Sequence, residues 1–258
     1  MCLIVFSFKD NSPFFKQNNS SEKEFVLLAN RDEFYDRPTL SMQWRGGNKN
    51  ILSGQDKLGG GTWFGVTKKG KFAAITNFRE KKEKKFTPSR GKLVLNYLKD
   101  ESVSAEDYLS NFNKNDYAGF NLLLGNKKQV IYISNRYPRP IKLTQGLHIL
   151  ANNNLNSPTQ KVEKTKRDFE ELLKNPFESE KAIEFMNSDQ SSQEHLLIEN
   201  LKKDKQEEIP FRFIKSKVYG TRSTTLFSFD SEGTFEITEQ NYTKQGKKLN
   251  INEFRFNT

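Results

Sequence analysis

The sequence has few of the residues that build disulfide networks and metal sites. It contains one cysteine, Cys2, and two histidines, His148 and His195, which are far apart in the chain. One cysteine excludes a disulfide framework, and no spacing of cysteine and histidine fits a zinc site. The pattern also argues against histidine-dependent catalysis. It is typical of a protein from a reducing compartment that needs no metal ion.

Long apolar runs are missing as well. No run approaches the roughly 20 residues that cross a bilayer. The segment Leu3–Phe6 is apolar, but it is too short for the core of a secretory signal and polar sequence follows it. We therefore expect a cytoplasmic protein, and its length allows one domain, residues 1–258, with a substantial core.

Acidic residues are outnumbered by basic ones, 32 against 42, which gives a formal net charge of +10. This excess favours an anionic partner but does not identify it. The densest basic run, Lys81–Lys85, has no interleaved aromatic residues, so the sequence predicts no nucleic-acid binding. A solvated loop is the simplest interpretation. Attraction to a phosphate-bearing ligand, or weak contact with an anionic membrane surface, is the alternative.

The order of strand and helix patterns predicts an α+β fold. Short apolar runs bounded by turn residues predict strands, and amphipathic segments predict helices. The sequence contains no internal repeat. The expected strands are 2–8, 25–29, 51–53, 62–67, 72–77, 120–124, 130–134, 147–151, 224–229 and 234–238. The expected helices are 92–98, 105–112, 179–186, 190–201 and one that begins at Ser157-Pro158 as N-cap and first residue.

Cys2 directly follows the initiator methionine. If Met1 is removed, one carbon carries both a thiol and a free α-amine, with ordinary pKa values of about 8.5 and 7.7–8.0. Such a pair supplies a nucleophile and its base near neutral pH. The alternative is that Cys2 is a small apolar residue at the start of a buried strand.

Polar residues end the second expected strand, at Asn30, Arg31, Asp32 and Glu33. Arg31 could lower the thiol pKa, because nearby cations favour the thiolate. Asp32 could hold the terminal ammonium. An ordinary ion-pair cluster at a strand end fits the same spacing.

Other polar segments lie beside expected strands. Gly59–Gly61 precedes Trp63 and lacks the Lys-Ser/Thr end of a phosphate-binding loop, so it predicts a turn beside a pocket. Asn77 offers an amide donor for an oxyanion. The segment 219–225 carries several hydroxyls and Arg222, which could contact an anion or the nucleophile. The asparagines at 152–154 suit either a site or a turn.

These segments together resemble the NRDE family, and the resemblance extends over essentially the whole chain. Its most specific part is the combination of an N-terminal Met-Cys with the Asn-Arg-Asp-Glu block. The segments that carry the resemblance are 1–4, 28–35, 37–38, 52–54, 60–65, 74–77, 89–91, 119–122 and 219–222.

The resemblance implies a four-layer αββα sandwich, the fold of the cysteine N-terminal-nucleophile hydrolases. Motif by motif it makes Cys2 the nucleophile, Asp32 the residue that orients it, Asn77 an oxyanion donor and Arg222 a cation near the thiol. It also makes Asn152 or Asn153 a second asparagine of the site. We place Asn30, Arg31 and Trp63 with the substrate-binding residues. The amidases of this class have an arginine three residues before the aspartate, where this chain has Ala29.

Two functions follow from the resemblance. The first is hydrolysis or transfer of acyl groups from amides or thioesters through Cys2, in lipid or acyl-coenzyme A metabolism. The second is a non-catalytic carrier of haem or lipid, linked to Golgi organisation and secretion. A small anionic or acyl-bearing partner, haem or an acyl-coenzyme A, suits the basic chain in both cases.

Overall fold

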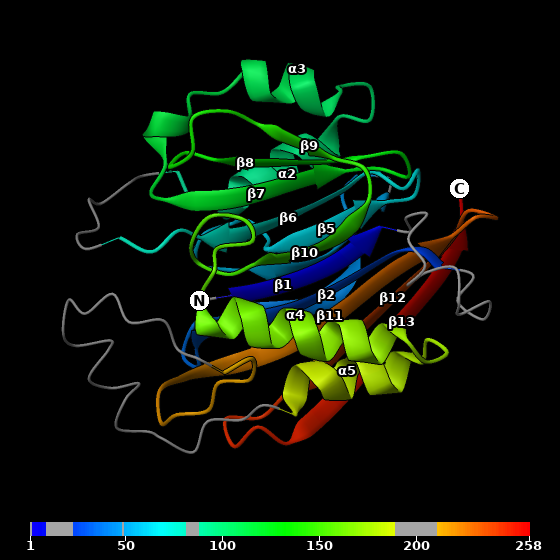
Figure 1. The fold of residues 1–258 in the computed structure, drawn as a ribbon. Coiled ribbons are helices and arrows are strands. Elements are labelled where there is room, and N and C mark those ends of the chain that lie inside the picture. The colour runs from blue at the N-terminus through cyan, green and yellow to red at the C-terminus, as the bar shows by residue number, and fades with distance from the viewer. Residues whose placement is uncertain (1, 9–22, 48, 81–87, 189–210) are drawn as a thin grey trace. The chain divides into compact units, whose positions relative to one another are not determined.

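The computed structural model describes residues 2–8, 23–47, 49–80, 88–188 and 211–258. Within them the chain forms two compact units, each built on one β-sheet (Figure 1). The expected helix 190–201 and the basic run 81–85 lie outside the described residues.

The first unit contains residues 2–36, 145–151 and 155–256, apart from the segments just excluded. Its sheet has six antiparallel strands in the order β10-β1-β2-β11-β12-β13. The strands are β1 (Cys2–Phe8), β2 (Lys23–Phe34), β10 (Gly146–Leu150), β11 (Tyr219–Asp230), β12 (Thr234–Tyr242) and β13 (Lys248–Asn257).

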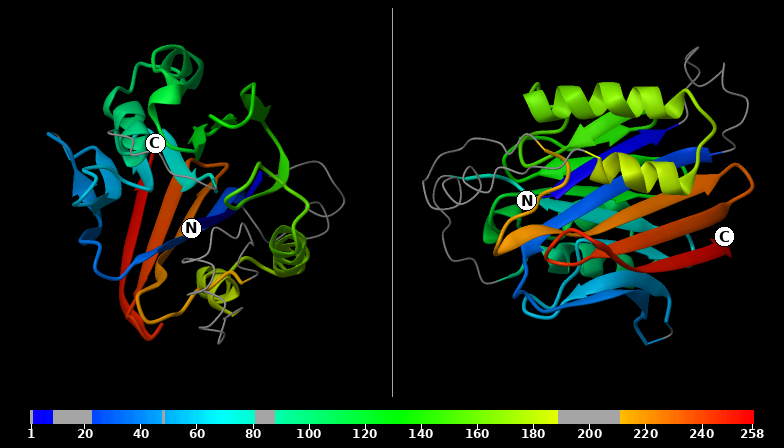
Figure 2. Two further views of the ribbon diagram at one scale, coloured as in Figure 1. Left: turned by 90° about the vertical axis from the view of Figure 1, so that its left-hand side faces the viewer. Right: turned by 90° about the horizontal axis from the view of Figure 1, so that it is seen from below.

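Two helices, α4 (Gln160–Leu173) and α5 (Ser179–Asn187), cover one face of this sheet (Figure 2). Their apolar residues, such as Phe169 and Met186, pack on Leu3, Leu28 and Leu226. Alternate residues of a strand point to opposite faces. The other face is therefore lined by the residues between these, among them the contacting rings of Phe6, Phe25, Phe227, Phe229 and Phe235.

The described residues of the second unit are 37–47, 49–80, 88–144 and 152–154, with the two C-terminal residues. Its sheet has seven antiparallel strands in sequence order. The strands are β3 (Thr39–Arg45), β4 (Ile51–Asp56), β5 (Phe64–Thr67), β6 (Phe72–Asn77), β7 (Phe120–Gly125), β8 (Val130–Ser134) and β9 (Ile141–Leu143).

The helices α2 (Gly91–Lys99) and α3 (Ala105–Ser110), followed by the 3₁₀ turn η1 (Lys114–Asp116), pack on this second sheet. Leu93 and Leu98 of α2 join Leu122 and Ile131 of the sheet in one core. Ser104 caps α3 by accepting a hydrogen bond from the Asp107 N–H, as expected.

Most predicted elements are confirmed, two predictions need correction, and three strands were missed. The second strand does not end at Ala29, because β2 continues through Asn30–Glu33 to Phe34. The N-cap of α4 is Thr159, which accepts from the Val162 N–H, and not Ser157. The strands β3, β9 and β13 were not predicted at all.

Candidate active site

Cys2 opens β1 and lies directly opposite Arg31 of β2. Opposed residues of an antiparallel pair share a face of the sheet, so the thiol and the guanidinium point to the same side. The backbone N–H of Asp32 hydrogen-bonds the sulfur. Cys2 itself is half-buried. The register thus brings the cysteine, a cation and the aspartate of the motif together.

Burial raises the pKa of the Cys2 thiol, and the Asp32 carboxylate raises it further. Arg31 acts in the opposite direction but does not outweigh burial. Arg31 thus lowers the thiol pKa as expected, but burial dominates and the overall shift is upward. A thiol of raised pKa is protonated at neutral pH, so any reaction at its sulfur needs a base.

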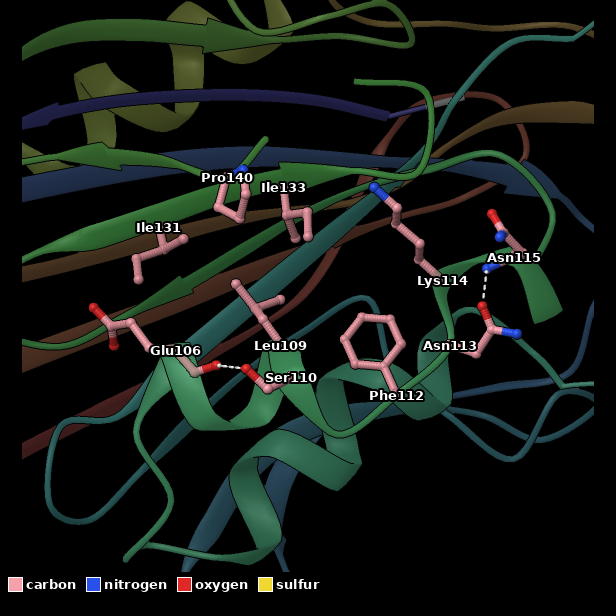
Figure 3. Close-up of a pocket in the computed structure, with 10 residues that line it drawn as sticks. All are labelled: Glu106, Leu109, Ser110, Phe112, Asn113, Lys114, Asn115, Ile131, Ile133 and Pro140. Carbon is pink, nitrogen blue, oxygen red and sulfur yellow. Dashed lines mark hydrogen bonds between the residues drawn. The ribbon is translucent and has the colours of Figure 1, made fainter. Parts of the chain in front are cut away.

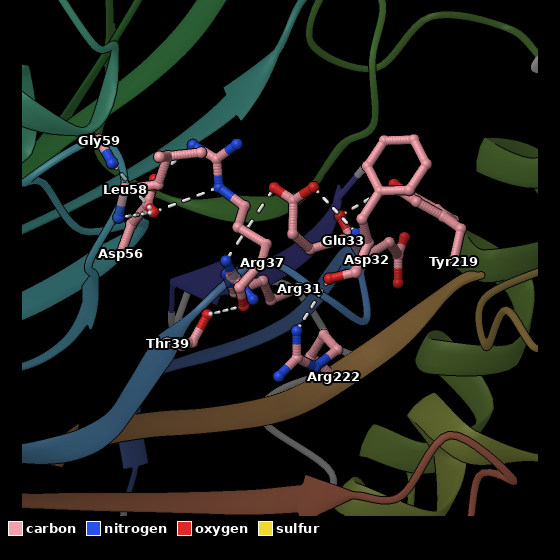
Figure 4. A network of polar contacts seen from close by, with 11 residues as sticks. Arg31, Asp32, Glu33, Arg37, Thr39, Asp56, Leu58, Gly59, Tyr219 and Arg222 are labelled. Atoms are coloured by element: carbon pink, nitrogen blue, oxygen red, sulfur yellow. Dashed lines mark hydrogen bonds and ion pairs between the residues drawn. The ribbon is translucent and has the colours of Figure 1, made fainter.

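Asp32 is 2% exposed and fixed by residues of β11 (Figure 4). Its Oδ1 accepts a hydrogen bond of 2.7 Å from the Thr221 hydroxyl. Its backbone carbonyl accepts one of 2.8 Å from the Tyr219 hydroxyl. Thr221 is itself fixed, because the Ile214 N–H donates to its Oγ1 at 2.9 Å. These bonds hold one carboxylate oxygen and the backbone of Asp32 against β11.

Burial raises the pKa of Asp32 to about 6. The positive charge of Lys161, the Thr221 hydrogen bond and Arg31 each oppose this shift. Lys161 lies in the first turn of α4 and is 3% exposed. Because alternate residues face opposite sides, Asp32 points to the helix-covered face and Cys2 to the other. The backbone nitrogen of Cys2 lies between these faces, in the plane of the sheet.

Arg222 occupies a position on β11 where the register with β2 shifts by one residue. Its guanidinium donates to the Phe34 carbonyl at 2.9 Å. The charges that shift the Cys2 pKa in the described structure are those of Asp32 and Arg31. The geometry thus anchors Arg222 to the end of β2, and its role toward the thiol stays a prediction.

Asn30 is 1% exposed, and its side chain is used inside the first unit. Its Nδ2 donates to the carbonyls of Met186 and Arg212, at 3.1 and 2.8 Å. Its Oδ1 accepts from the Thr224 hydroxyl at 2.6 Å. Both amide hydrogens are therefore occupied, which gives Asn30 a structural role. Substrate binding by Asn30 and Arg31 stays a prediction.

Asn77, Asn152 and Asn153 lie in the second unit. The Asn152 side chain donates to the Asn77 carbonyl at 2.9 Å, and the Arg79 N–H donates to the Asn152 carbonyl at 2.8 Å. The Asn153 carbonyl accepts from the buried Asn121 side chain at 2.9 Å. The segment 152–154 is thereby tied to the end of β6, and the roles of Asn77, Asn152 and Asn153 in a Cys2 site stay predictions.

The glycine run allows close packing in the second unit. A Cβ on Gly61 would lie 2.3 Å from the backbone of Gly91, where α2 begins. A Cβ on Gly54 would lie 2.3 Å from the ring of Trp63. The run and the tryptophan thus have a structural function here, and substrate contact by Trp63 stays a prediction.

Sequence reasoning missed the contact that Thr221 makes in the site, and it missed Lys161 altogether. The Thr221 hydroxyl was expected at the nucleophile or an anion, and it binds the carboxylate of Asp32. Lys161 carried no signal, because it is one of three lysines in an amphipathic helix whose positive and negative charges are equal in number.

Two sheets, each with helices on one face, and a cysteine at the start of a strand define a protein with the N-terminal-nucleophile hydrolase fold. A solved structure supports this assignment, that of the Caenorhabditis elegans N-acylethanolamine-hydrolyzing acid amidase ortholog. It aligns with a TM-score of 0.51 over 87% of this chain and 92% of its own, at 12% sequence identity.

Sequence comparison identifies the family. A family model described as transport and Golgi organisation 2 matches residues 1–244. The mouse homologue of that name is 30% identical, with 99% of each chain covered. The human homologue is 31% identical, covering 93% of this chain and 92% of its own. The chain belongs to the transport and Golgi organisation 2 family, which confirms the predicted NRDE resemblance.

No helix in the described part of the chain is long and apolar enough to cross a membrane.

Proposed function

We propose that this protein is a cysteine N-terminal-nucleophile enzyme that cleaves or transfers acyl groups from amides or thioesters through Cys2. The observation that carries the proposal is the β1–β2 register. It puts Cys2 opposite buried Arg31 and places the Asp32 N–H on the sulfur.

The proposed reaction begins after removal of Met1, when Cys2 carries the free α-amine. The sulfur attacks the carbonyl carbon of the substrate while its proton passes to the amine. That proton then moves to the leaving nitrogen or sulfur as its bond to carbon breaks. An acyl group remains on Cys2 as a thioester. Water or a second acceptor displaces it, and the thiol is regenerated.

The electrostatics suit this route better than a free thiolate. A thiol of raised pKa keeps its proton until the base removes it during attack. Asp32, with a pKa of about 6, is mostly ionised at pH 7 and could hold the ammonium that forms. In this mechanism Asp32 orients the α-amine that acts as the base, and the Cys2 sulfur forms the new bond to the acyl carbon.

The substrate class is an acyl compound of lipid metabolism. The structural relative from Caenorhabditis elegans is named for hydrolysis of N-acylethanolamines, which are fatty amides. Acyl-coenzyme A thioesters offer the same carbonyl chemistry, and their phosphates suit a chain with a net charge of +10. We place the reaction in the cytoplasm, with a link to transport and Golgi organisation that the family description suggests.

A carrier of haem or lipid without catalysis is the second candidate. The raised pKa of Cys2 favours it, because a thiol that stays protonated at neutral pH is a weak nucleophile. The same shift argues against Cys2 as a thiolate ligand to haem iron, since that ligand must lose its proton. A lipid carrier needs neither a nucleophilic thiol nor a thiolate that binds iron.

The test is turnover of an N-acylethanolamine and an acyl-coenzyme A of matched chain length, with hemin titration in parallel. An enzyme releases fatty acid, and Cys2→Ala abolishes release while Cys2→Ser retains a small fraction of it. Turnover that survives in Cys2→Ala contradicts the mechanism. Stoichiometric hemin or lipid binding, with no turnover of either substrate, supports the carrier instead.

A further inference from the structure

The second unit has a pocket of about 450 Å³ between α3, the turn η1 and the strand β8. Apolar side chains form its wall, namely those of Leu109, Phe112, Ile131, Ile133 and Pro140 (Figure 3). Ile131 and Ile133 are 3% and 5% exposed, so the floor belongs to the core of the unit. The size lies within the range of small-molecule sites, about 300–1,000 Å³.

The charges of the pocket are separated. In Figure 3 the ammonium of Lys114 and the carboxylate of Glu106 lie at opposite ends of the apolar wall. Lys114 is half-buried, and the described residues provide no ion pair for it. Glu106 accepts a hydrogen bond from Gln129 at 3.2 Å. The pocket therefore offers one cation for a ligand beside a hydrocarbon surface, and one anion at the far end.

The backbone of Lys114 is held in place by hydrogen bonds. The Lys114 carbonyl accepts a hydrogen bond of 3.1 Å from the Asn135 side chain. The preceding residue, Asn113, caps η1 by accepting from the Asn115 N–H. The Lys114 backbone is therefore fixed at the rim of the pocket. Only its side chain needs to change conformation when a ligand binds, which keeps the entropic cost of binding small.

We propose that this pocket binds an amphipathic monocarboxylate of medium chain length. The carboxylate pairs with Lys114, and the hydrocarbon chain covers Leu109, Phe112 and Ile133. Glu106 at the far end repels a second negative charge, so the site prefers a monocarboxylate over a dicarboxylate. The inference does not depend on chemistry at Cys2.

The experiment uses the full chain and three probes of equal chain length: decanoate, decanol and decanedioate, each below its micelle concentration. Calorimetry measures affinity, and methyl NMR of Ile131 and Ile133 reports where the probe lies. We expect decanoate to bind more tightly than decanol and decanedioate, and to shift both isoleucine methyls.

Lys114→Gln removes the charge but keeps most of the stem. It should weaken decanoate binding about tenfold or more, as expected for a charge-assisted hydrogen bond, and leave decanol binding unchanged. Lys128→Gln, at an exposed lysine of the β7–β8 turn, is the matched control and should change neither. Glu106→Gln should reduce the difference in affinity between decanoate and decanedioate.

Three results would overturn the proposal. The first is the absence of binding by all three probes. The second is decanoate affinity that falls equally in Lys114→Gln and Lys128→Gln, or in neither. The third is binding that leaves both isoleucine methyls unshifted.

Discussion

The hydrogen bond from Thr221 to Asp32 gives the most quantitative prediction. Thr221→Val keeps the shape of the side chain and removes the hydroxyl. A hydrogen bond to a charged group contributes about 1.5–3 kcal/mol, and one pKa unit corresponds to about 1.4 kcal/mol. Losing this bond should therefore raise the Asp32 pKa from about 6 to about 7–8 by these magnitudes.

The sign of the functional effect follows from the role of the carboxylate. Activity that needs ionised Asp32 rises with pH through its pKa, so the rising limb should move from near pH 6 to near pH 7–8 in Thr221→Val. At pH 7 the ionised fraction, and with it kcat/KM, should fall about two- to tenfold by the same shift. The variant should also lose about 2 kcal/mol of stability, because the Ile214 N–H loses its acceptor.

The assay is a ¹³C NMR titration of the Asp32 carboxyl, with the pH dependence of kcat/KM beside it. Thr225→Val is a matched control on the same strand. The Thr225 hydroxyl is buried and has no hydrogen-bond partner in the described structure, so its removal should leave both curves unchanged. An Asp32 pKa that is the same in Thr221→Val and wild type would refute the reasoning.

Three further changes test other parts of the structure. Asp32→Asn should abolish acyl transfer while the protein stays folded. The carboxyl has a raised pKa in the folded protein, so its contribution to stability falls as pH rises from about 4 to about 6. The free energy of unfolding, measured with denaturant, should show this pH dependence in wild type and not in Asp32→Asn. Gly61→Ala should cost about 2 kcal/mol or more, because its Cβ would meet the backbone of Gly91 at 2.3 Å, whereas Gly47→Ala meets nothing within 4 Å and should be neutral. Lys71→Met should lower the thermal unfolding midpoint, because the ammonium donates to two backbone carbonyls after α2, each at 2.6 Å. An equal drop in the midpoint when an exposed lysine is changed to methionine would contradict that role.

Local pattern was enough to predict the central strands. The strands 2–8, 72–77 and 130–134 were predicted at their observed bounds, because buried apolar runs bounded by turn residues specify a strand without help from distant residues. The edge strand β13 is exposed over 248–251, alternates half-buried and exposed residues over 252–257, and carries no such run. Its pairing with β12 is a tertiary effect that the pattern does not encode.

The candidate site was predictable in its members but not in its geometry. Cys2 and Asp32 followed from the motif. The extension of β2 past Ala29 did not, because Asn30 and Asp32 are tolerated inside a strand only where Thr224 and Thr221 of β11 satisfy them. The direction of the Cys2 pKa shift was mispredicted for a related reason: burial of the site depends on the whole fold, whereas neighbouring charges are visible in the sequence.

The most direct test of the central claim is the mass of the native N-terminal peptide before and after brief incubation with an acyl-coenzyme A. We predict a peptide that begins at Cys2 and gains one acyl group. Hydroxylamine should release that group, as expected of a thioester, and Cys2→Ala should not acquire it. A peptide that retains Met1, or that never carries an acyl group with any amide or thioester offered, would contradict the account.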